Sequence, residues 1–543
     1  MKISGNIIDI KGKRIYAGTL DVERGRIIRV EETGVEKVGD RYILPGFIDA
    51  HVHIESSMVV PSEFARMAAV HGTVATVSDP HEIGNVLGVA GVEYMIANGR
   101  EVPFKFYFGA PSCVPATTFE TAGATIGVDD VEALLKKDEV RYLAEMMNWP
   151  GVLYKNADVM AKIALARKYG KVVDGHAPGL RGEQARDYIA AGMSTDHECF
   201  TAEEALDKLQ YGMKIIIREG SAARNFEALI GLLNDHEDAI MFCSDDKHPD
   251  SLEEGHINVL VRRALAKGID LFKVLKAACI TPAEHYGLAV GQLRAGDTAD
   301  FIVVDNVKNF NVLQTFIDGT LVAEQGRSHI ARVPVAIVNA FATNEKRKED
   351  FQLPYTGGQI RVIEAIDGQL VTGSVFVTPQ VSNGLVVSDV DQDVLKIAVV
   401  NRYRDSPPAV GFIRNFGLKR GAIASSVGHD SHNILVVGVD DASIARAVNL
   451  IIAAKGGVSA VDGHTEFILP LPVAGIMSAD DGYTVAQQYK HIDSLAKGMG
   501  STLGSPYMTL SFMGLLVIPS LKLSDLGLFD GDRFTFVDVQ PKG

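Results

Sequence analysis

The pattern of hydrophobic and polar residues begins with short apolar runs that are separated by glycine and charged residues. Three such runs come before residue 42, at Ile3 to Ile10, Ile15 to Val22 and Ile27 to Glu31. Their length and composition are typical of strands, and a helix is hard to fit to them. The first forty residues are therefore predicted to form a small β-sheet.

From Tyr42 onward, β-branched apolar runs alternate with longer stretches of helical spacing, and this unit repeats eight times. The strands are predicted to end near His53, Asp79, Gly109, Glu145, His176, His197, Gly220 and Asp245. Helices are predicted over segments such as Pro61–Val70, Val128–Lys137, Asp158–Tyr169, Gly182–Ala191 and Ala202–Tyr211. Eight alternating units indicate an α/β fold in which a parallel sheet closes into a (β/α)8 TIM-type barrel, which typically needs about 250 residues. The alternative is an open doubly wound sheet, which usually has a glycine-rich fingerprint after its first strand, where this chain has His-x-His.

The β pattern returns after Leu288, in residues 291–305 and 316–326. These strands are predicted to complete the N-terminal sheet. We therefore expect a small β-sandwich formed by both flanks, residues 1–42 and 289–332, around a barrel over residues 43–288. Residues 333–543 are rich in Gly and Val and mix strands with helices, so a separate C-terminal α/β domain is expected there.

Charge and composition limit the classes of partner. The 543 residues include 53 Lys and Arg against 68 Asp and Glu, a formal net charge of −15. An acidic surface repels phosphate backbones, so nucleic acid is not an expected partner, although a nucleobase without phosphate is compatible. The four cysteines form no C-x-x-C pair, and neither a signal-peptide core nor a run of roughly 20 apolar residues is present. These features predict a cytoplasmic protein without membrane contact.

Polar residues that can bind metal follow the predicted strands. His51 and His53 are two residues apart on a strand, so both side chains point to the same face, as two ligands of one ion must. The other candidates at strand ends are Glu145, His176, His197 and Asp245. Each histidine alone is more typical of a structural hydrogen bond, but active-site groups of such a barrel project from the carboxyl ends of its strands. Together these six residues predict a metal centre at the mouth of the barrel.

Glu145 differs from the histidines because it follows an apolar run, VRYLAEMMN. A buried carboxylate is costly unless a cation compensates its charge. Placed between two ions that are about 3.5–4 Å apart, it could bridge them. The alternative is a side chain that faces the helix layer and reaches solvent.

Several motifs taken together resemble the adenine deaminases of the amidohydrolase superfamily. The resemblance rests on the segments GFIDAHVHIESSM, VSDPHEIGNVLG, LAEMMNWPGV, DGHAPGLRG, TDHEC, FCSDDKHPD and EGHIN. GFIRNFGLKRGAIASSVGHDSHNI and LPLPVAGIMS are similar to the C-terminal domain of that family. His-x-His alone indicates only the superfamily, whereas DPHE with AEMMN points to adenine deaminase.

The resemblance implies two divalent metal ions. His51, His53 and Asp245 would bind the inner ion, His176 and His197 the outer one, and Glu145 would bridge them. Many relatives use a carboxylated lysine as the bridge, so Lys155 is the rival candidate. Oxygen and imidazole ligands suit Mn, Fe or Zn, and the family favours iron or manganese.

The expected reaction is hydrolysis of adenine to hypoxanthine and ammonia, in purine salvage or catabolism, by a hydroxide that the ions activate. Asp245 is expected to carry the proton from the nucleophile to the departing ammonia. His81 and Glu82 are candidates for protonating or orienting N1, and a Glu82 that stays protonated through a raised pKa is one hypothesis. DPHE could instead only shape the turn after the second strand. Asp79, Asp246 and Glu55 are further candidates for substrate contacts.

Two other functions remain open from the sequence. One is a related amidohydrolase that opens a cyclic amide, resembling an imidazolonepropionase or a dihydropyrimidinase. The other is a non-catalytic scaffold, which should lack some ligands, whereas all six are present. His429 and His432, in GHDSHN, are expected to pack internally or to lie at the edge of the main pocket. A homo-oligomer such as a dimer is expected, with adenine as the small-molecule partner.

Overall fold

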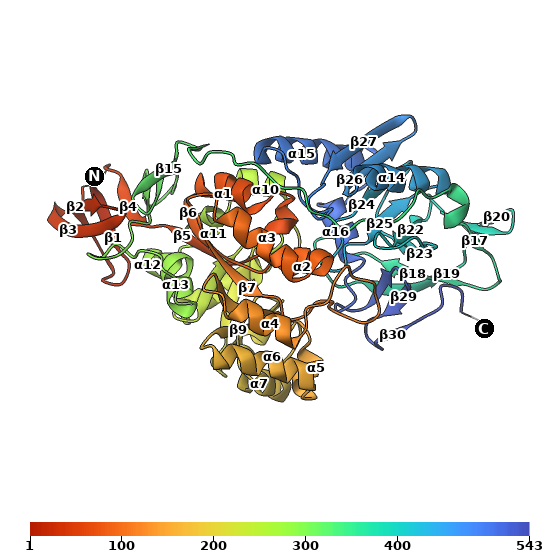
Figure 1. The fold of residues 1–543 in the computed structure, drawn as a ribbon, viewed down its shortest axis with the longest axis horizontal. Helices are drawn as coiled ribbons and strands as arrows, with labels where there is room; N and C mark the ends of the chain where they lie inside the picture. The colour runs from red at the N-terminus through yellow and green to blue at the C-terminus, as the bar shows by residue number, and fades with distance from the viewer. Residues whose placement is uncertain (38, 542–543) are drawn as a thin grey trace.

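Both flanks of the chain contribute strands to one sheet at the N-terminal end of the molecule (Figure 1). The computed structural model describes residues 1–37 and 39–541. The sheet has the order β16-β15-β14-β13-β4-β1-β2-β3. Its strands are β1 (Lys2–Asp9), β2 (Arg14–Glu23), β3 (Arg26–Val35), β4 (Tyr42–Pro45), β13 (Phe301–Val304), β14 (Val312–Ile317), β15 (Thr320–Glu324) and β16 (Arg327–Ser328). Because β4 pairs with both β1 and β13, it joins the two flanks directly before the barrel begins.

The central part is the predicted barrel of eight parallel strands, whose order along the sheet follows the order along the chain. The strands are β5 (Phe47–Val52), β6 (Thr73–Ser78), β7 (Lys105–Ala110), β8 (Val140–Met146), β9 (Val172–Gly175), β10 (Met193–Asp196), β11 (Lys214–Arg218) and β12 (Ile240–Cys243). A parallel bridge between Val52 and Asp245 brings the first and last strands together. The backbone N–H of Asp245 donates to the carbonyl of His51 over 3.0 Å, so the sheet closes next to the predicted ligands. The TIM-type fold class is thereby confirmed, and the open-sheet alternative is wrong.

Helices follow the strands and cover the outside of the barrel (Figure 1). They are η1 (Ile54–Ser57), α1 (Pro61–Ala69), α2 (His81–Leu87), α3 (Val89–Gly99), α4 (Val128–Leu135), α5 (Trp149–Leu153), α6 (Ala157–Lys168), α7 (Gly182–Ala190), α8 (Ala202–Leu209), α9 (Phe226–Leu229), η2 (Ile230–Asn234), α10 (Pro249–Glu254), α11 (Ile257–Ala266), α12 (Leu271–Leu275), η3 (Lys276–Ile280) and α13 (Thr281–His285). Several helices begin at a residue whose side chain caps the helix N-terminus. The Asn156 side chain accepts hydrogen bonds from backbone N–H groups in the first turn of α6, and the Thr201 side chain accepts one in α8. Within residues 1–37 and 39–541, no helix has the length and apolar character to cross a membrane.

The C-terminal part is built on a third eight-stranded sheet, of order β19-β18-β23-β22-β25-β24-β26-β27. Its strands are β18 (Ile360–Glu364), β19 (Gly373–Val377), β22 (Val394–Val400), β23 (Ala409–Arg414), β24 (Ala422–Ser425), β25 (Ile434–Gly438), β26 (Gly457–Asp462) and β27 (Thr465–Pro470). The associated helices are η4 (Lys348–Phe351), α14 (Asp441–Ala454), α15 (Gly482–Gly498) and α16 (Pro506–Phe512). One small three-stranded sheet contains β17 (Leu353–Pro354), β20 (Gln380–Ser382) and β21 (Leu385–Val387). A second one contains β28 (Leu521–Ser524), β29 (Gly527–Asp530) and β30 (Thr535–Phe536).

Alternation along β22 explains how this sheet is covered on both faces. Ala398 and Val400 pack in the cluster that contains α14, whereas Ile397 and Val399 pack in the large core that also contains the barrel. Successive side chains of a strand point to opposite faces, so one face contacts α14 and the other faces the rest of the molecule. The C-terminal part is therefore packed against the barrel, while the domain limits at residues 42, 288 and 332 stay a prediction.

His248 lies in this interface, between β12 and α10. Its ring is 2% exposed and packs edge-on against Tyr489 of α15, with ring centroids 4.6 Å apart. Burial, together with the charge of His429, lowers the pKa of His248 to about 3. The folded protein therefore holds this imidazole neutral at pH values where an unfolded histidine is protonated.

This arrangement predicts a pH-dependent stability. An unfolded histidine titrates near pH 6.5, so the folded state loses relative stability as the pH falls from about 6.5 toward about 3, by about 2 kcal/mol at pH 5 from this residue. H248F, which keeps a ring against Tyr489, should lose about 2 kcal/mol less than the unmodified protein between pH 7 and pH 5. Urea denaturation at both pH values measures the difference. H464F, at an exposed histidine, is the control, and equal pH dependence in all three proteins would contradict the interpretation.

Candidate metal centre and active site

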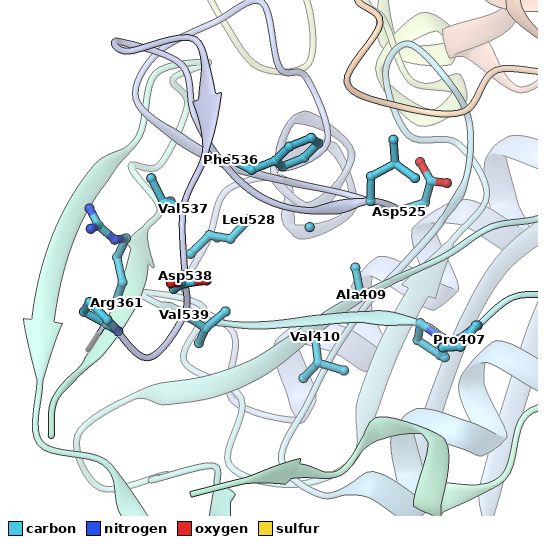
Figure 2. A pocket seen from close by; sticks show the side chains of 14 residues that line it. Arg361, Pro407, Ala409, Val410, Asp525, Leu528, Phe536, Val537, Asp538 and Val539 are labelled. Carbon is cyan, nitrogen blue, oxygen red and sulfur yellow. The ribbon is translucent and has the colours of Figure 1, made fainter. Parts of the chain in front are cut away.

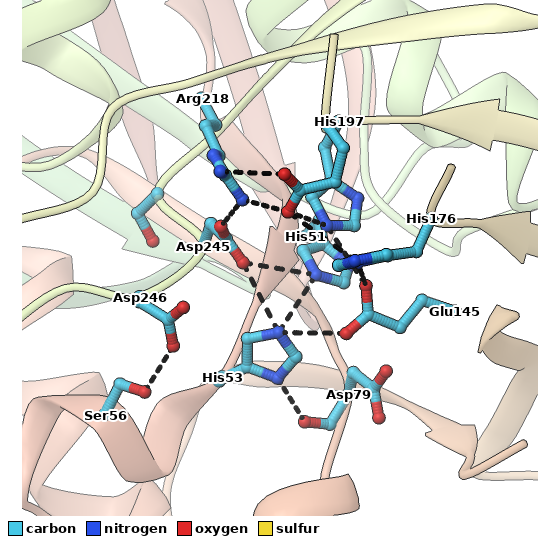
Figure 3. Close-up of polar contacts among 12 residues, drawn as sticks. His51, His53, Ser56, Asp79, Glu145, His176, His197, Arg218, Asp245 and Asp246 are labelled. Carbon is cyan, nitrogen blue, oxygen red and sulfur yellow. Dashed lines mark hydrogen bonds and ion pairs between the residues drawn. The ribbon is translucent and has the colours of Figure 1, made fainter. Parts of the chain in front are cut away.

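The six predicted ligands meet at one end of the barrel (Figure 3). They come from the ends of β5, β8, β9, β10 and β12, and none is more than 6% exposed: His51, His53, Glu145, His176, His197 and Asp245. Residues that are far apart in sequence thus share one buried site, because parallel strands of a barrel end on the same side.

Three of these side chains form a first group. The Nε2 atoms of His51 and His53 are 3.2 Å apart, and they lie 3.4 Å and 3.3 Å from Oδ1 of Asp245. Nδ1 of His53 lies 3.1 Å from the backbone carbonyl of Asp79, to which it can only donate. In the neutral ring, Nε2 then has a lone pair that faces other nitrogen and oxygen acceptors. Converging lone pairs of this kind fit a bound cation.

Glu145 connects this group to a second one (Figure 3). Its Oε1 lies 3.5 Å from Nε2 of His53, whereas Oε2 lies 2.8 Å from Nδ1 of His176 and 3.1 Å from Nε2 of His197. Burial opposes ionisation of Glu145, but the charges of His176 and His197 and their hydrogen bonds outweigh it and hold the pKa of Glu145 well below its usual value. The two oxygens of one carboxylate therefore serve two separate groups of imidazoles.

Nitrogen and oxygen donors in this number, with two buried carboxylates and no thiolate, fit divalent metal ions. Lys155, the rival bridging residue, is exposed and lies just beyond α5. It is therefore placed away from the buried ligands, and the side chain between the two histidine groups is Glu145.

Arg218 and Glu198 were missed by the sequence interpretation. Arg218 ends β11 and contacts both Oδ2 of Asp245 and the carboxylate of Glu198, with an Nη2–Oε2 distance of 3.0 Å to Glu198. Oε1 of Glu198 also lies 3.5 Å from Nε2 of His197. The signals were present, since Glu198 directly follows His197 and Arg218 ends an apolar run, but neither residue type is rare in such a place. Asp245 itself has a φ of 53°, an uncommon backbone conformation outside glycine that is often found at functional sites.

The DPHE motif both shapes a turn and faces the site. The backbone N–H of His81 donates to Oδ1 of Asp79 over 3.1 Å, at the start of α2. His81 Nδ1 lies 3.5 Å from Oε1 of Glu145, and His81 Nε2 lies 3.6 Å from Oε1 of Glu82. Glu55 accepts from the backbone N–H of Ile83, so it supports α2.

Glu82 is held by histidines from the C-terminal part. Its Oε1 contacts Nδ1 of His429, and its Oε2 lies 2.5 Å from Nε2 of His432. Burial opposes ionisation, but the neighbouring imidazoles of His429, His432 and His81, with the His429 hydrogen bond, outweigh it and hold the pKa of Glu82 well below its usual value. This direction is opposite to the raised pKa that the sequence hypothesis gave Glu82, because that hypothesis omitted imidazoles that come from residues more than 340 positions away.

A pocket opens beside these groups. Its lining comprises His53, His81, Glu82, Glu145, Met147, His176, His197, Glu198, Arg218, Asp245, Asp246, Leu370, His429, Asp430, Phe512 and Leu515. Asp246 is thus at the pocket, whereas Asp79 and Glu55 are not among its lining residues. His429 is at the pocket edge, one of the two positions expected for it. The polar lining comes mostly from the barrel, and the apolar side chains of Leu370, Phe512 and Leu515 come from the C-terminal part.

A second hollow lies elsewhere in the C-terminal part (Figure 2). Arg361, Asp525 and Asp538 are its charged lining residues, and it shares no lining residue with the pocket at the barrel mouth. Its described lining includes neither histidine nor cysteine. Of these two pockets, only the one at the barrel mouth is therefore lined by candidate metal ligands.

Comparison with known proteins matches both major parts of the chain. Residues 42–322 match the amidohydrolase family, and residues 369–535 match the adenine deaminase C-terminal domain. An adenine deaminase from Salinibacter ruber is 56% identical over 99% of this chain and 98% of its own length, and one from Methanosarcina mazei is 52% identical over 99% of both chains. Among solved structures, N-acetyl-D-glucosamine-6-phosphate deacetylase from Mycobacterium smegmatis is 17% identical, with a TM-score of 0.47 over 60% of this chain and all of its own.

Removal of the Arg218 charge should destabilise the site. Arg218, Glu198 and Asp245 are all at most 3% exposed, so R218M leaves two buried carboxylates without their shared cation. We expect a loss of about 3–5 kcal/mol in the free energy of unfolding of chelator-treated protein, and partial recovery in R218M/E198Q. Chemical denaturation measures both. R24M, at a side chain that is 93% exposed, should change little, and an R218M protein as stable as R24M would refute the role of this charge.

Proposed function

The chain belongs to the adenine deaminase family of the amidohydrolases, and we propose that it hydrolyses adenine to hypoxanthine and ammonia. The observation that carries this proposal is the position of Glu145, whose two oxygens face separate groups of imidazoles at the mouth of the barrel. Relatives that are 56% and 52% identical over 99% of this chain support it and are named adenine deaminases. The reaction class is therefore metal-dependent hydrolysis of the C6–N bond of the purine.

We propose two divalent ions, with manganese or iron as the first candidates and zinc as the next. His51, His53 and Asp245 would bind one ion, His176 and His197 the other, and Glu145 would bind both. When bound, such ions lower the pKa of water enough to supply a hydroxide nucleophile near neutral pH. Glu198, 3.5 Å from Nε2 of His197, supports the second group.

Asp245 is the proposed proton carrier. Arg218 holds its Oδ2 and leaves Oδ1 toward His51 and His53. Asp245 would accept a proton from the attacking water and pass it to the C6 amino group, which leaves as ammonia while the C6–O bond remains. One water is consumed for each adenine, and hypoxanthine keeps the oxygen.

His81 and Glu82 are proposed to act on the ring. Because Glu82 faces two histidines as an ionised carboxylate, it is suited to accept a hydrogen bond and orient the purine. His81 is the candidate to donate a proton to N1 as electron density moves there, and to take back a proton from the C6 hydroxyl as the carbonyl of hypoxanthine forms. Asp246, which accepts from the Ser56 hydroxyl over 2.6 Å, lies at the pocket as a further candidate for a purine contact. A cytoplasmic location and a homo-oligomeric state stay predictions.

Substrate assays distinguish this proposal from hydrolysis of another cyclic amide. Purified protein with bound metal should release ammonia from adenine, and adenosine should be a poor substrate if the ribose prevents entry into the pocket. Cytosine and hydantoins complete the panel. Turnover of hydantoins without turnover of adenine would exclude adenine deamination as the function.

The bridging role of Glu145 can be tested by metal analysis. E145Q removes the charge that is shared by both histidine groups, so metal content should fall from two ions per chain to one or fewer. Turnover should fall by about 100-fold or more, beyond the 10–100-fold typical of a lost outer partner. K155M is the matched control, since Lys155 is exposed, and should keep both ions. Loss of metal in K155M with retention in E145Q would assign the bridge to the lysine.

A further inference from the structure

The loop between β24 and β25 reaches from the C-terminal part to α2 of the barrel. It brings His429 and His432 against the two oxygens of Glu82, and all three side chains are at most 3% exposed. The contact joins segments that are almost 350 residues apart, and it lies beside the pocket at the barrel mouth. A residue of the proposed active site is thus held by a different part of the chain.

The protonation of His432 follows from its own loop. The backbone N–H of Gly428 donates to Nδ1 of His432 over 3.2 Å, and the backbone N–H of His432 donates back to the Gly428 carbonyl over 2.7 Å. Nδ1 therefore uses its lone pair, and in the neutral ring the proton is on Nε2. That nitrogen lies 2.5 Å from Oε2 of Glu82, so it presents N–H and not a lone pair. A metal ion at Nε2 would require an anionic ring.

His429 and His432 differ in what else they contact. His429 lines the pocket, its Nε2 lies 3.7 Å from Asp246, and its ring stacks on Phe512 with centroids 5.2 Å apart. His432 is not among the lining residues. A change at His432 can therefore reach the substrate only through a neighbour such as Glu82 or His429, or through the fold of the loop.

We propose that His432 is a positioning residue for deamination: it holds the Glu82 carboxylate in the orientation that the purine requires, so the C-terminal part completes the active site. The inference rests on the proposed function, and in particular on the contact of Glu82 with the ring. Oε1 is hydrogen-bonded to His429, and Oε2 lies 2.5 Å from Nε2 of His432, so imidazoles face this carboxylate from both sides. Such preorganisation of a catalytic group depends on partners that do not themselves touch the substrate.

A double-mutant cycle on the full-length protein with bound metal tests this role. H432L should lower kcat on adenine by about 10–100-fold, the usual cost of a lost outer partner, with a much smaller change in KM. H432Q, whose side-chain amide can donate to the same carboxylate, should recover most of the activity. In an E82Q background, H432L should add little further loss, because the partner that His432 positions has already changed.

Controls separate this role from folding and from metal binding. H464L, at an exposed histidine of the same part of the chain, should keep the turnover of the unmodified protein. Metal content of H432L should stay at the wild-type value, and its thermal midpoint should stay above the assay temperature, although the loss of a partner of the buried Glu82 carboxylate lowers it. If H432L fails to fold, H432N, which is polar but too short to reach Glu82, replaces it in the cycle.

Three results would each overturn the proposal. The first is an unchanged kcat in H432L and H432N, and the second is an equal fold loss of kcat from H432L in the wild-type and E82Q backgrounds. The third is a lower metal content in H432L than in the unmodified protein. The failures are distinguishable. If E82Q is impaired while H432L keeps full activity, only the positioning role of His432 is refuted. Full activity of E82Q removes Glu82 from the mechanism and this inference with it, while deamination of adenine stands. Absence of any adenine turnover in the unmodified protein refutes the proposed function itself.

Discussion

Charge compensation around Glu145 is the constraint on which the site depends. A carboxylate that is 3% exposed is stable only where hydrogen-bond donors or cations surround it, and the imidazoles of His53, His176 and His197 face its two oxygens. The closed barrel makes this possible, because it brings the ends of β5, β8, β9, β10 and β12 to one place.

A second layer of charge surrounds these ligands. Arg218 occupies the oxygen of Asp245 that faces away from the histidines, and Glu198 offsets the arginine on its other side. The backbone carbonyl of Asp79 sets which nitrogen of His53 has the lone pair. Asp245 and His53 therefore each have a neighbour that fixes their orientation, as ligands of metal sites commonly do.

The C-terminal part contributes side chains to the pocket at the barrel mouth. Leu370, Phe512 and Leu515 supply most of the apolar lining of a pocket whose polar groups come from the barrel. A planar purine needs both kinds of surface, since aromatic and aliphatic side chains pack against its faces while polar groups contact its edge. Both parts of the protein thus line the pocket in which we propose that the nucleobase binds.

The sequence by itself determined the barrel and the six candidate ligands, because hydrophobic periodicity and the places where polar residues interrupt it are local properties of the chain. His51 and His53, or Glu145 after its apolar run, could be assigned from a few neighbouring residues. Only the tertiary structure decided the partners of those residues. Arg218 beside Asp245, and His432 against Glu82, depend on contacts between distant segments. The direction of the Glu82 pKa followed from those contacts, since a local pattern has no information about which charge will face a buried group from the other side.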